Sequence, residues 1–159
     1  MERLPHGTRR LAAQLSTQTH SDFIWSALTD YDHLSDFIPN LSTSILISKV
    51  DNCVHLKQVG CQQLMGLKFS AKVQIELIEY YQERTLNFRL LKGDFRRFEG
   101  AWRIKETNEG KGSRLFYELT VQGCIGMPVT LIEQRLREDL KTNLLAVEAE
   151  AARRSLIKP

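Results

Sequence analysis

The length and composition of this chain already exclude several classes of protein. Its 159 residues are 42% hydrophobic and 26% charged, as in an ordinary globular domain, and this balance excludes both a disordered chain and a membrane-embedded one. The formal net charge of +3 is too small to argue by itself for a nucleic-acid partner. Three cysteines without a CxxC pair favour a reducing, cytoplasmic location, and we expect neither a secretory signal nor a transmembrane helix.

The N-terminal forty residues predict one strand and two short helices. Residues 9–17 alternate between apolar and polar side chains, which is typical of a strand with one buried face. A helix over residues 22–28 is expected to follow, with Thr19 or Ser21 as its N-cap. A second helix over residues 32–37 should end before the next proline, because the residue preceding a proline disfavours the helical conformation.

From residue 42 to residue 122 the apolar residues recur with a period of two, which predicts six strands joined by short turns. The clearest alternation begins at Leu67 and continues to Leu77, as a sheet with one solvated face requires. Ile45 and Ile47 share one face of the first strand, and a bulge near Gln58 would reconcile a mixed pattern in the second. The six strands are expected over residues 42–50, 53–64, 67–78, 85–91, 95–106 and 113–122.

The last part of the chain changes to a helical period. Pro128 suits the first turn of a helix, and nothing interrupts a helix from there to about Arg154. Most of its charged residues, including Arg135 and Asp139, are placed off the apolar stripe. A helix of this length is the only predicted element large enough to cover the apolar face of an antiparallel sheet. The stripe consists of Val129, Ile132, Leu136, Leu140, Leu144 and Val147.

With this order of elements, two stretches of the chain resemble a known family. Residues 28–39 (LTDYDHLSDFIP) and the segment ending at Trp102 (LLKGDFRRFEGAW) are similar to the polyketide cyclase/dehydrase family of the START-like (SRPBCC) superfamily, in particular its coenzyme-Q-binding-protein-like subgroup. Asp94, however, stands where the family often has proline. The resemblance implies an α+β helix-grip fold in one domain, residues 1–159. In that fold a curved antiparallel sheet of about seven strands surrounds the long C-terminal helix, with two short helices after the first strand.

The inward-facing residues of the predicted sheet and helix are almost all apolar. Such a set can form either a filled core or the wall of a cavity. Ala71 and Gly100 at inward positions leave room, and the resemblance implies a cavity between sheet and helix. Arg96 could meet a ligand head group there or form an ordinary salt bridge. We therefore predict a ligand site formed by Phe37, Phe69, Val73, Phe88, Arg96, Phe98, Trp102, Tyr117, Ile132, Leu136 and Leu140.

No motif predicts a catalytic group, a metal site or a cofactor. The four histidines form no HxH or HxxxH pair, and the chain has no GxGxxG or Walker A loop. Cys61 and Cys124 are interpreted as incidental thiols. Glu133 is expected on a solvated helix flank, with the cavity mouth as the alternative. The other carboxylates of interest are predicted to lie on solvated faces: Glu76, Glu79, Glu99, Glu106 and Glu118.

Three functions remain open at this point. We favour binding, transport or chaperoning of a hydrophobic small molecule, such as a quinone, isoprenoid or lipid. Its entrance would be formed by residues 25–37 and 125–128, which could also touch a membrane transiently. A polyketide cyclase/dehydratase-type enzyme is the first alternative, with Tyr117 as its best acid–base group. A ribosome-associated factor is the second and least favoured, because charged sheet exteriors are common. The outward basic residues that motivate it are Lys57, Lys68, Lys72 and Arg89.

Overall fold

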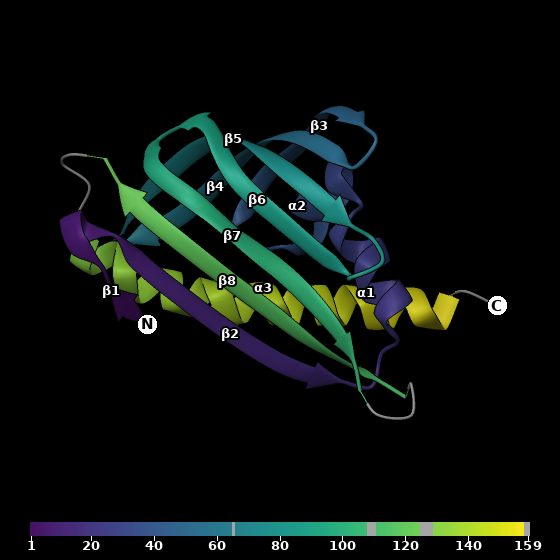
Figure 1. Ribbon diagram of the computed structural model, residues 1–159. Helices are drawn as coiled ribbons and strands as arrows, with labels where there is room; N and C mark the ends of the chain where they lie inside the picture. Colours follow the sequence, from purple (N-terminus) through teal and green to yellow (C-terminus); the bar gives the residue numbers. More distant parts are fainter. Residues whose placement is uncertain (65, 108–110, 125–128, 158–159) are drawn as a thin grey trace.

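The strands of the protein form one antiparallel sheet that curves around a single long helix (Figure 1). The computed structural model describes residues 1–64, 66–107, 111–124 and 129–157. Within them the eight strands are β1 (Glu2–Arg3), β2 (Arg9–Thr17), β3 (Leu41–Val50), β4 (Cys53–Leu64), β5 (Leu67–Tyr80), β6 (Thr85–Gly93), β7 (Phe95–Glu106) and β8 (Ser113–Gly123). Their order across the sheet is β1-β2-β8-β7-β6-β5-β4-β3, so the meander predicted for residues 42–122 is confirmed.

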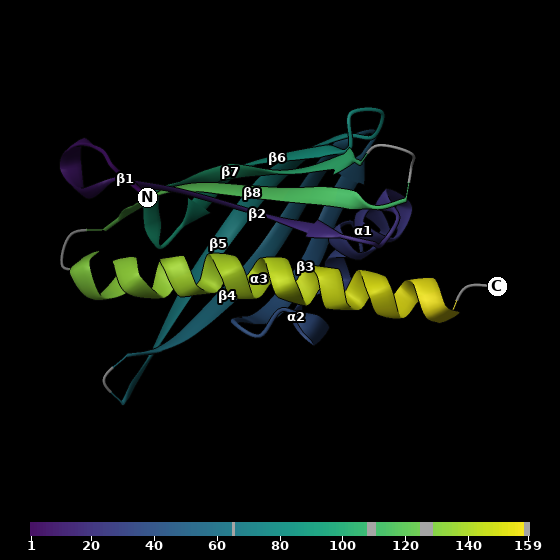
Figure 2. The same ribbon diagram turned by 90° about the horizontal axis from the view of Figure 1, so that it is seen from below.

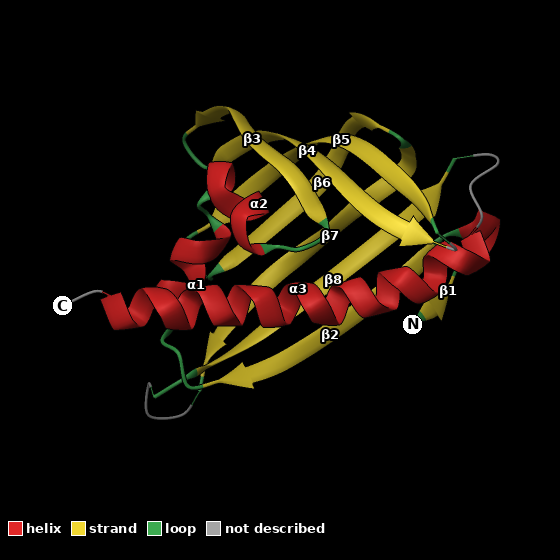
Figure 3. Cartoon of the chain, turned by 180° about the vertical axis from the view of Figure 1, so that it is seen from behind, coloured by secondary structure: helices red, strands yellow, loops and turns green. Residues whose placement is uncertain are grey.

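The shorter helices connect strands of this sheet, and the long C-terminal helix covers its concave face. They are η1 (Pro5–Gly7), α1 (Ser21–Leu28), η2 (Tyr31–His33), α2 (Leu34–Phe37) and α3 (Val129–Ile157). Helix α3 crosses the concave face, and α1 and α2 lie beside its C-terminal half (Figures 2 and 3). The predicted fold class is therefore confirmed, with one more strand than expected, since the two residues of β1 are too short to show a period. No helix among the described residues has both the length and the apolar character needed to span a membrane.

Local contacts explain where the short helices begin and end. The His20 ring accepts a hydrogen bond from the backbone N–H of Asp22 at 3.1 Å, so His20 caps α1. The predicted caps, Thr19 and Ser21, were wrong. The Ser21 hydroxyl is buried and instead donates to Glu106 at 2.9 Å, which ties the start of α1 to the end of β7. The second helix starts as a 3-10 turn and stops before Pro39, as predicted.

The register of β4 decides which of its side chains face α3. Strands β4 and β5 pair without any shift, so the predicted bulge near Gln58 was wrong. The extra residues lie on β3 instead, at Ser42 and Ile47, where the pairing with β4 shifts by one. Because β4 keeps one parity throughout, its inward face runs from buried Leu56 through Gln58 to Gln62. This face therefore turns from apolar to polar along the strand.

Apolar packing between α3 and the sheet forms one side of the core. Leu140, Leu144 and Val147 of the predicted stripe are buried and Leu136 is partly buried, while the side chains of Val129 and Ile132 lie outside the described residues. Each buried leucine or valine contributes roughly 1.5–3 kcal/mol to the free energy of folding. The sheet supplies the opposite surface, which includes Val54, Leu56, Ile75, Leu77, Leu86, Ile104 and Leu115.

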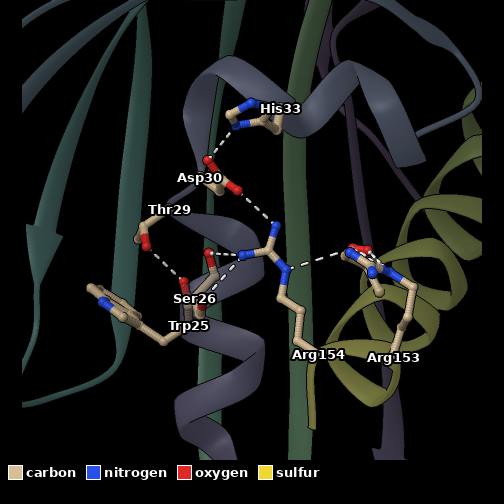
Figure 4. Close-up of polar contacts among 8 residues, drawn as sticks. Trp25, Ser26, Thr29, Asp30, His33, Arg153 and Arg154 are labelled. Carbon is tan, nitrogen blue, oxygen red and sulfur yellow. Dashed lines mark hydrogen bonds and ion pairs between the residues drawn. The ribbon is translucent and has the colours of Figure 1, made fainter. Parts of the chain in front are cut away.

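A set of ion pairs holds the C-terminal end of α3 against α1 (Figure 4). Arg154 donates to Asp30 at 2.7 Å and to the Ser26 hydroxyl at 3.0 Å, and its Nε lies 3.6 Å from a Glu150 oxygen. We call Ser26, Asp30, Glu150 and Arg154 the C-terminal clamp. Burial alone would raise the pKa of Asp30, but hydrogen bonds from His33 and Arg154 outweigh it and lower that pKa. The carboxylate therefore stays ionised and paired.

Candidate ligand cavity

A cavity of about 320 Å³ lies between the concave face of the sheet and α3. Its walls come from β4 to β8, from α3, and from the segment that includes α1, η2 and α2. Most of the lining side chains are aliphatic or aromatic, and the volume lies within the range of roughly 300–1,000 Å³ typical of small-molecule sites. The alternative of a completely filled core therefore does not apply here.

One wall of the cavity is built from aromatic side chains of β6, β7 and β8. The rings of Trp102 and Tyr117 stack with their centroids 3.9 Å apart and an interplanar angle of 8°. Phe98 packs against Phe88 at 5.7 Å and against Phe95 at 5.4 Å. Such contacts restrict the rotation of each ring, so this wall is a preformed apolar surface, although Phe88 is tilted by 42° against Phe98 and by 45° against Tyr117.

The cavity also carries a cluster of polar side chains from α3, from β4 and from the turn before β3. Asp139 of α3 accepts a hydrogen bond from the Asn40 amide at 2.7 Å through Oδ1 and another from the Gln62 amide through Oδ2. Asn143 lies one turn further along α3 on the same side of the cavity. We call Asn40, Gln62, Asp139 and Asn143 the polar cluster. It gives the cavity one polar end within otherwise apolar walls.

Two acceptor oxygens of the polar cluster are buried without a hydrogen bond. Neither Gln62 Oε1 nor Asn143 Oδ1 has a partner among the described residues. The orientation of Gln62 follows from its contact, because its amide nitrogen is directed to Asp139 and its oxygen must then face the other way. A buried acceptor without a donor costs roughly 1–3 kcal/mol. Both oxygens can therefore accept a hydrogen bond from a group outside the protein, either water or a ligand.

Burial alters the acid–base behaviour of the two titratable groups in the cavity. Desolvation raises the pKa of Asp139 to about 6, although the charge of Arg135 and the hydrogen bond from Gln62 act in the opposite direction. The pKa of Tyr117 is raised well above its usual value, first by burial and then by the negative charge of Asp139. At neutral pH the tyrosine is thus a hydroxyl donor, and Asp139 is mostly ionised but close to its titration range.

Most of the residues predicted for the ligand site do line this cavity, but three of them require comment. Phe69 faces it with 42% of its surface still exposed, which places this ring at the cavity rim. Phe37 packs against the core from α2 and does not line the cavity, and the side chain of Ile132 lies outside the described residues. The predicted residues that line the cavity are listed next, and their contact with a ligand stays a prediction: Phe69, Val73, Phe88, Phe98, Trp102, Tyr117, Leu136 and Leu140.

The placement of Arg96 in the site was wrong, and the register of β7 explains why. The pairing of β7 with β8 shifts between Phe95 and Arg97, so that Phe95 and Phe98 both face the cavity. Arg96 and Arg97 are left exposed on the other side, and Arg97 pairs with Glu99. The first residues of β7 therefore contribute two aromatic rings to the cavity and no charge.

Only one of the two small inward residues provides space. Ala71 lines the cavity, as predicted. Gly100 does not: a Cβ atom at this position would collide with the backbone oxygen of Glu118 and the Phe88 ring. The absence of a side chain at Gly100 instead lets β7, β8 and Phe88 approach closely.

Several polar residues lie where the sequence pattern did not place them. Glu79 was predicted on a solvated face, yet its side chain is largely buried and accepts a hydrogen bond from Tyr31. Glu106 is exposed, as predicted, and accepts a hydrogen bond from Ser21. The Glu133 side chain is only 8% exposed and binds Arg9 and Arg3, which excludes the solvated flank expected for it. It does not line the cavity.

The polar cluster itself was missed, although α3 carries a usable signal. Arg135, Asp139 and Asn143 recur every fourth residue, directly beside the row formed by Leu136 and Leu140. A sheet that curves around the helix contacts both rows, so the polar row also lines the cavity. The predicted entrance is tested only in part. Trp25 is buried against Tyr81, and residues 125–128 lie outside the described residues.

Solved structures with the same architecture come from several bacteria. TTHA0849 from Thermus thermophilus superposes with a TM-score of 0.80 at 18% identity, over 92% of this chain and 99% of that one. The Zhui aromatase/cyclase from Streptomyces sp. R1128 gives 0.81 at 15%, over 93% and 96%. A START superfamily protein from Mycobacterium smegmatis gives 0.74 at 15%, over 91% and 97%. At these identities the likeness concerns the fold alone.

The sequence also matches a family model directly. No match is found among curated proteins. The family model described as polyketide cyclase / dehydrase and lipid transport covers residues 20–148, which is most of the chain. This stretch runs from the start of α1 through strands β3 to β8 and most of α3, and so includes every residue of the polar cluster. The chain therefore belongs to the polyketide cyclase/dehydrase and lipid transport family.

Proposed function

We propose that the protein binds a neutral hydrophobic small molecule that presents a hydroxyl group to the polar cluster. The observation that carries this proposal is the pair of unpartnered acceptors, Gln62 Oε1 and Asn143 Oδ1, at the end of an apolar cavity. A hydroxyl donor would remove the cost of burying these oxygens without a hydrogen bond. A carboxylate would instead bring a second negative charge beside Asp139, and the positive charge of Arg135, which lines the same cavity, already acts on Asp139.

The apolar walls would provide most of the affinity. A ligand that buries about 200 Å² of apolar surface gains roughly 5 kcal/mol at about 25 cal/mol per Å², before the entropic cost of association. The aromatic wall around Trp102 and Tyr117 suits a flat ring, while the aliphatic side of the cavity suits a short chain. Quinols, prenyl alcohols and small hydroxylated lipids all combine these features, so carriage of such a compound is the proposed role. Three free cysteines support a reducing compartment such as the cytoplasm.

The direct test of this function is to look for a small molecule bound to the purified protein. We expect native mass spectrometry, on protein prepared without detergent, to reveal a co-purifying hydrophobic molecule at near-unit stoichiometry. Ala71→Phe should abolish retention, because the larger ring fills the cavity from β5. Lys72→Phe is the matched control, since it places the same ring on the exposed face of the same strand. Equal retention by both variants would refute binding in this cavity.

The hydroxyl preference is tested with two probes of similar shape. We expect β-naphthol to change the fluorescence of Trp102 saturably, and β-naphthoate to bind at least about tenfold more weakly near neutral pH. Trp102→Phe should remove the signal without removing the binding, which calorimetry would record. Preferential binding of the naphthoate would contradict the assignment of the polar cluster as a hydrogen-bond acceptor site.

A cyclase or dehydratase is the second candidate, and one observation favours it. Asp139, with a pKa of about 6, and the protonated Tyr117 face one cavity, so a proton acceptor and a proton donor are both available. The protein also shares its fold with the Zhui aromatase/cyclase. Assays with poly-β-ketone substrates would test this activity. Unchanged turnover in both Asp139→Asn and Tyr117→Phe would remove the acid–base groups on which this candidate depends.

A further inference from the structure

The face of the sheet opposite the cavity carries a group of three metal-ligating side chains. Cys53 and His55 lie on β4 and Glu76 lies on β5. One ligand atom of each, the thiol sulfur, an imidazole nitrogen and a carboxylate oxygen, lies within 4.8 Å of the other two. Helix α3 covers the other face of the sheet (Figure 2), so this group is separate from the cavity.

The sequence and the register together account for this arrangement. Cys53 and His55 are two residues apart on a strand, so both point away from the concave face that buries Val54. His55 pairs directly with Glu76 across the β4–β5 ladder. The three ligands thus stand on two adjacent, regularly paired strands, whose backbone fixes their spacing more firmly than loops would.

The donor set has the chemistry of a zinc site. Thiolate, imidazole and carboxylate are the three ligand types that zinc takes from proteins, and three of them leave a fourth position for water or another ligand. A tetrahedral zinc ion separates its ligand atoms by about 3.3–3.8 Å. His55 Nε2 and Glu76 Oε2 are already 3.2 Å apart, and the Cys53 sulfur lies within 4.8 Å of a ligand atom of each of these residues.

The surroundings of Glu76 are compatible with metal binding and also limit its strength. Arg89 donates to Glu76 Oε1 at 3.0 Å, which leaves Oε2 directed to His55. Such an outer hydrogen bond orients a ligating carboxylate. The guanidinium charge also repels a cation, so the affinity should be lower than that of a buried structural site. His55 and Glu76 are partly exposed, with 37% and 19% of their side-chain surfaces accessible, so the group is reachable from solvent.

We propose that Cys53, His55 and Glu76 form a binding site for one zinc ion on the convex face of the sheet. Binding exchanges the thiol proton of Cys53 for the metal and releases that proton to solvent. The ion would cross-link β4 and β5, whose inner residues Leu56 and Ile75 line the cavity, and would stabilise this pair of strands. The site requires no cavity ligand, so it stands independently of the proposed function.

Cobalt(II) is a suitable probe because its complexes are coloured. We expect titration of the metal-free, reduced protein to give one cobalt per chain, with the near-ultraviolet band of a thiolate–cobalt bond. One equivalent of zinc should remove this band. Cys53→Ser should abolish the band, and Glu76→Gln should weaken binding at least about tenfold, since the loss of even an outer-shell partner commonly costs 10–100-fold.

Two matched controls use residues of the same sheet. Cys61→Ser removes another thiol of β4, and Glu118→Gln removes a carboxylate paired with Arg103; neither residue belongs to the group. Both variants should bind cobalt like the wild type, and zinc should raise their Tm but not that of Cys53→Ser. The absence of the band in the wild type, its persistence in Cys53→Ser or its loss in Cys61→Ser would overturn the proposal.

Discussion

The two halves of α3 bury polar groups in opposite ways. At the C-terminal end, the clamp surrounds Arg154 with partners from two helices, and Glu150 is also bonded to Arg153 at 2.6 Å. Beside the cavity, Asp139 has two amide donors, while the amide oxygens of Gln62 and Asn143 have no partner among the described residues. The same helix therefore carries one set of charged groups that are ion-paired within the protein, in which only Arg154 Nε is buried without a hydrogen bond and lies 3.6 Å from Glu150, and one polar set with two uncharged acceptor oxygens left without a partner among the described residues.

Within α3, this difference distinguishes residues that hold the fold together from residues that are available to bind a ligand. Charges that are buried and fully paired hold parts of a fold together, and removal of one partner leaves the others without compensation. Polar atoms that are buried and unpaired reduce stability, and native proteins rarely keep them without a reason. We therefore assign the clamp to the docking of α1 on α3, and the polar cluster to recognition of a ligand. The predictions below test this assignment through stability.

The largest effect is expected from Arg154→Met at the clamp. The substitution keeps the aliphatic stem but leaves Asp30 and Glu150 without the guanidinium, so we expect a loss of about 2 kcal/mol in the free energy of unfolding. Urea denaturation near neutral pH measures it. Arg103→Met is the matched control, because its ion pair with Glu118 is exposed and should contribute less than about 1 kcal/mol. Equal losses in the two variants would contradict the structural role of the clamp.

A smaller effect of opposite sign is expected from Asp139→Asn. The pKa of Asp139 is raised from 3.8 to about 6, so the folded state holds this proton more tightly than the unfolded state. The resulting stabilisation is present below about pH 4 and is lost as the pH rises through about 6. The amide avoids ionisation but replaces one of the two acceptor oxygens of Asp139 with a donor, so that one hydrogen bond from Asn40 or Gln62 is lost unless the Gln62 amide turns over. We therefore expect the variant to gain at most about 1 kcal/mol over the wild type near pH 8, after allowance for partial exposure. The gain should vanish near pH 4.

Glu133 on the same helix provides a control with the reverse pH dependence. Hydrogen bonds from Arg9 and Arg3 lower the pKa of Glu133 despite the opposing effect of burial. Its contribution is therefore present above pH 4.5, its usual pKa, and is lost as the pH falls through the lowered value. We expect Glu133→Gln to be less stable than the wild type at neutral pH and to approach it in acid. Parallel pH profiles for the two variants would disprove the distinction between a carboxylate paired with arginines and one bonded to neutral amides.

The smallest effect is expected from His33→Gln at the rim of the clamp. The hydrogen bond to Asp30 raises the pKa of His33, so its contribution is present below pH 6.5 and is lost as the pH rises through the raised value. Thermal unfolding should therefore separate the variant from the wild type near pH 5 and not near pH 9. A difference that grows with pH would show that the imidazolium does not support Asp30.

The fold was predictable because its signals are local and repeated. Alternation from Leu67 to Leu77 and the helical stripe ending at Val147 each extend over many residues, so single exceptions do not change the outcome. The errors in predicting which side chains face the cavity arose where one extra residue shifts the pairing of two strands. The extra residues of β3 lie at Ser42 and Ile47, and the shift at the start of β7 turns Arg96 to solvent. Nothing in the side-chain pattern specifies the position of such a shift.

The candidate site was predictable only in its apolar part. Its aromatic wall follows from strand parity, but the polar cluster joins Asn40, Gln62 and Asp139 from three distant segments, and their proximity depends on how far the sheet curves. The metal-ligating group was missed for a simpler reason. The proximity of a histidine to a cysteine was overlooked, although Cys53 and His55 are two residues apart on one strand face.

The edges of the sheet have a consequence for the behaviour of the protein at high concentration. An open sheet has two outer strands, and a long, regular outer strand invites pairing with another molecule. β1 is only two residues long, and β3 is interrupted by its two extra residues, while Asp32 accepts the backbone N–H of Leu46 at 2.7 Å. Ile45 and Ile47 remain half-exposed on β3. These interruptions oppose fibril-like growth from the β3 edge, where the exposed isoleucines lie.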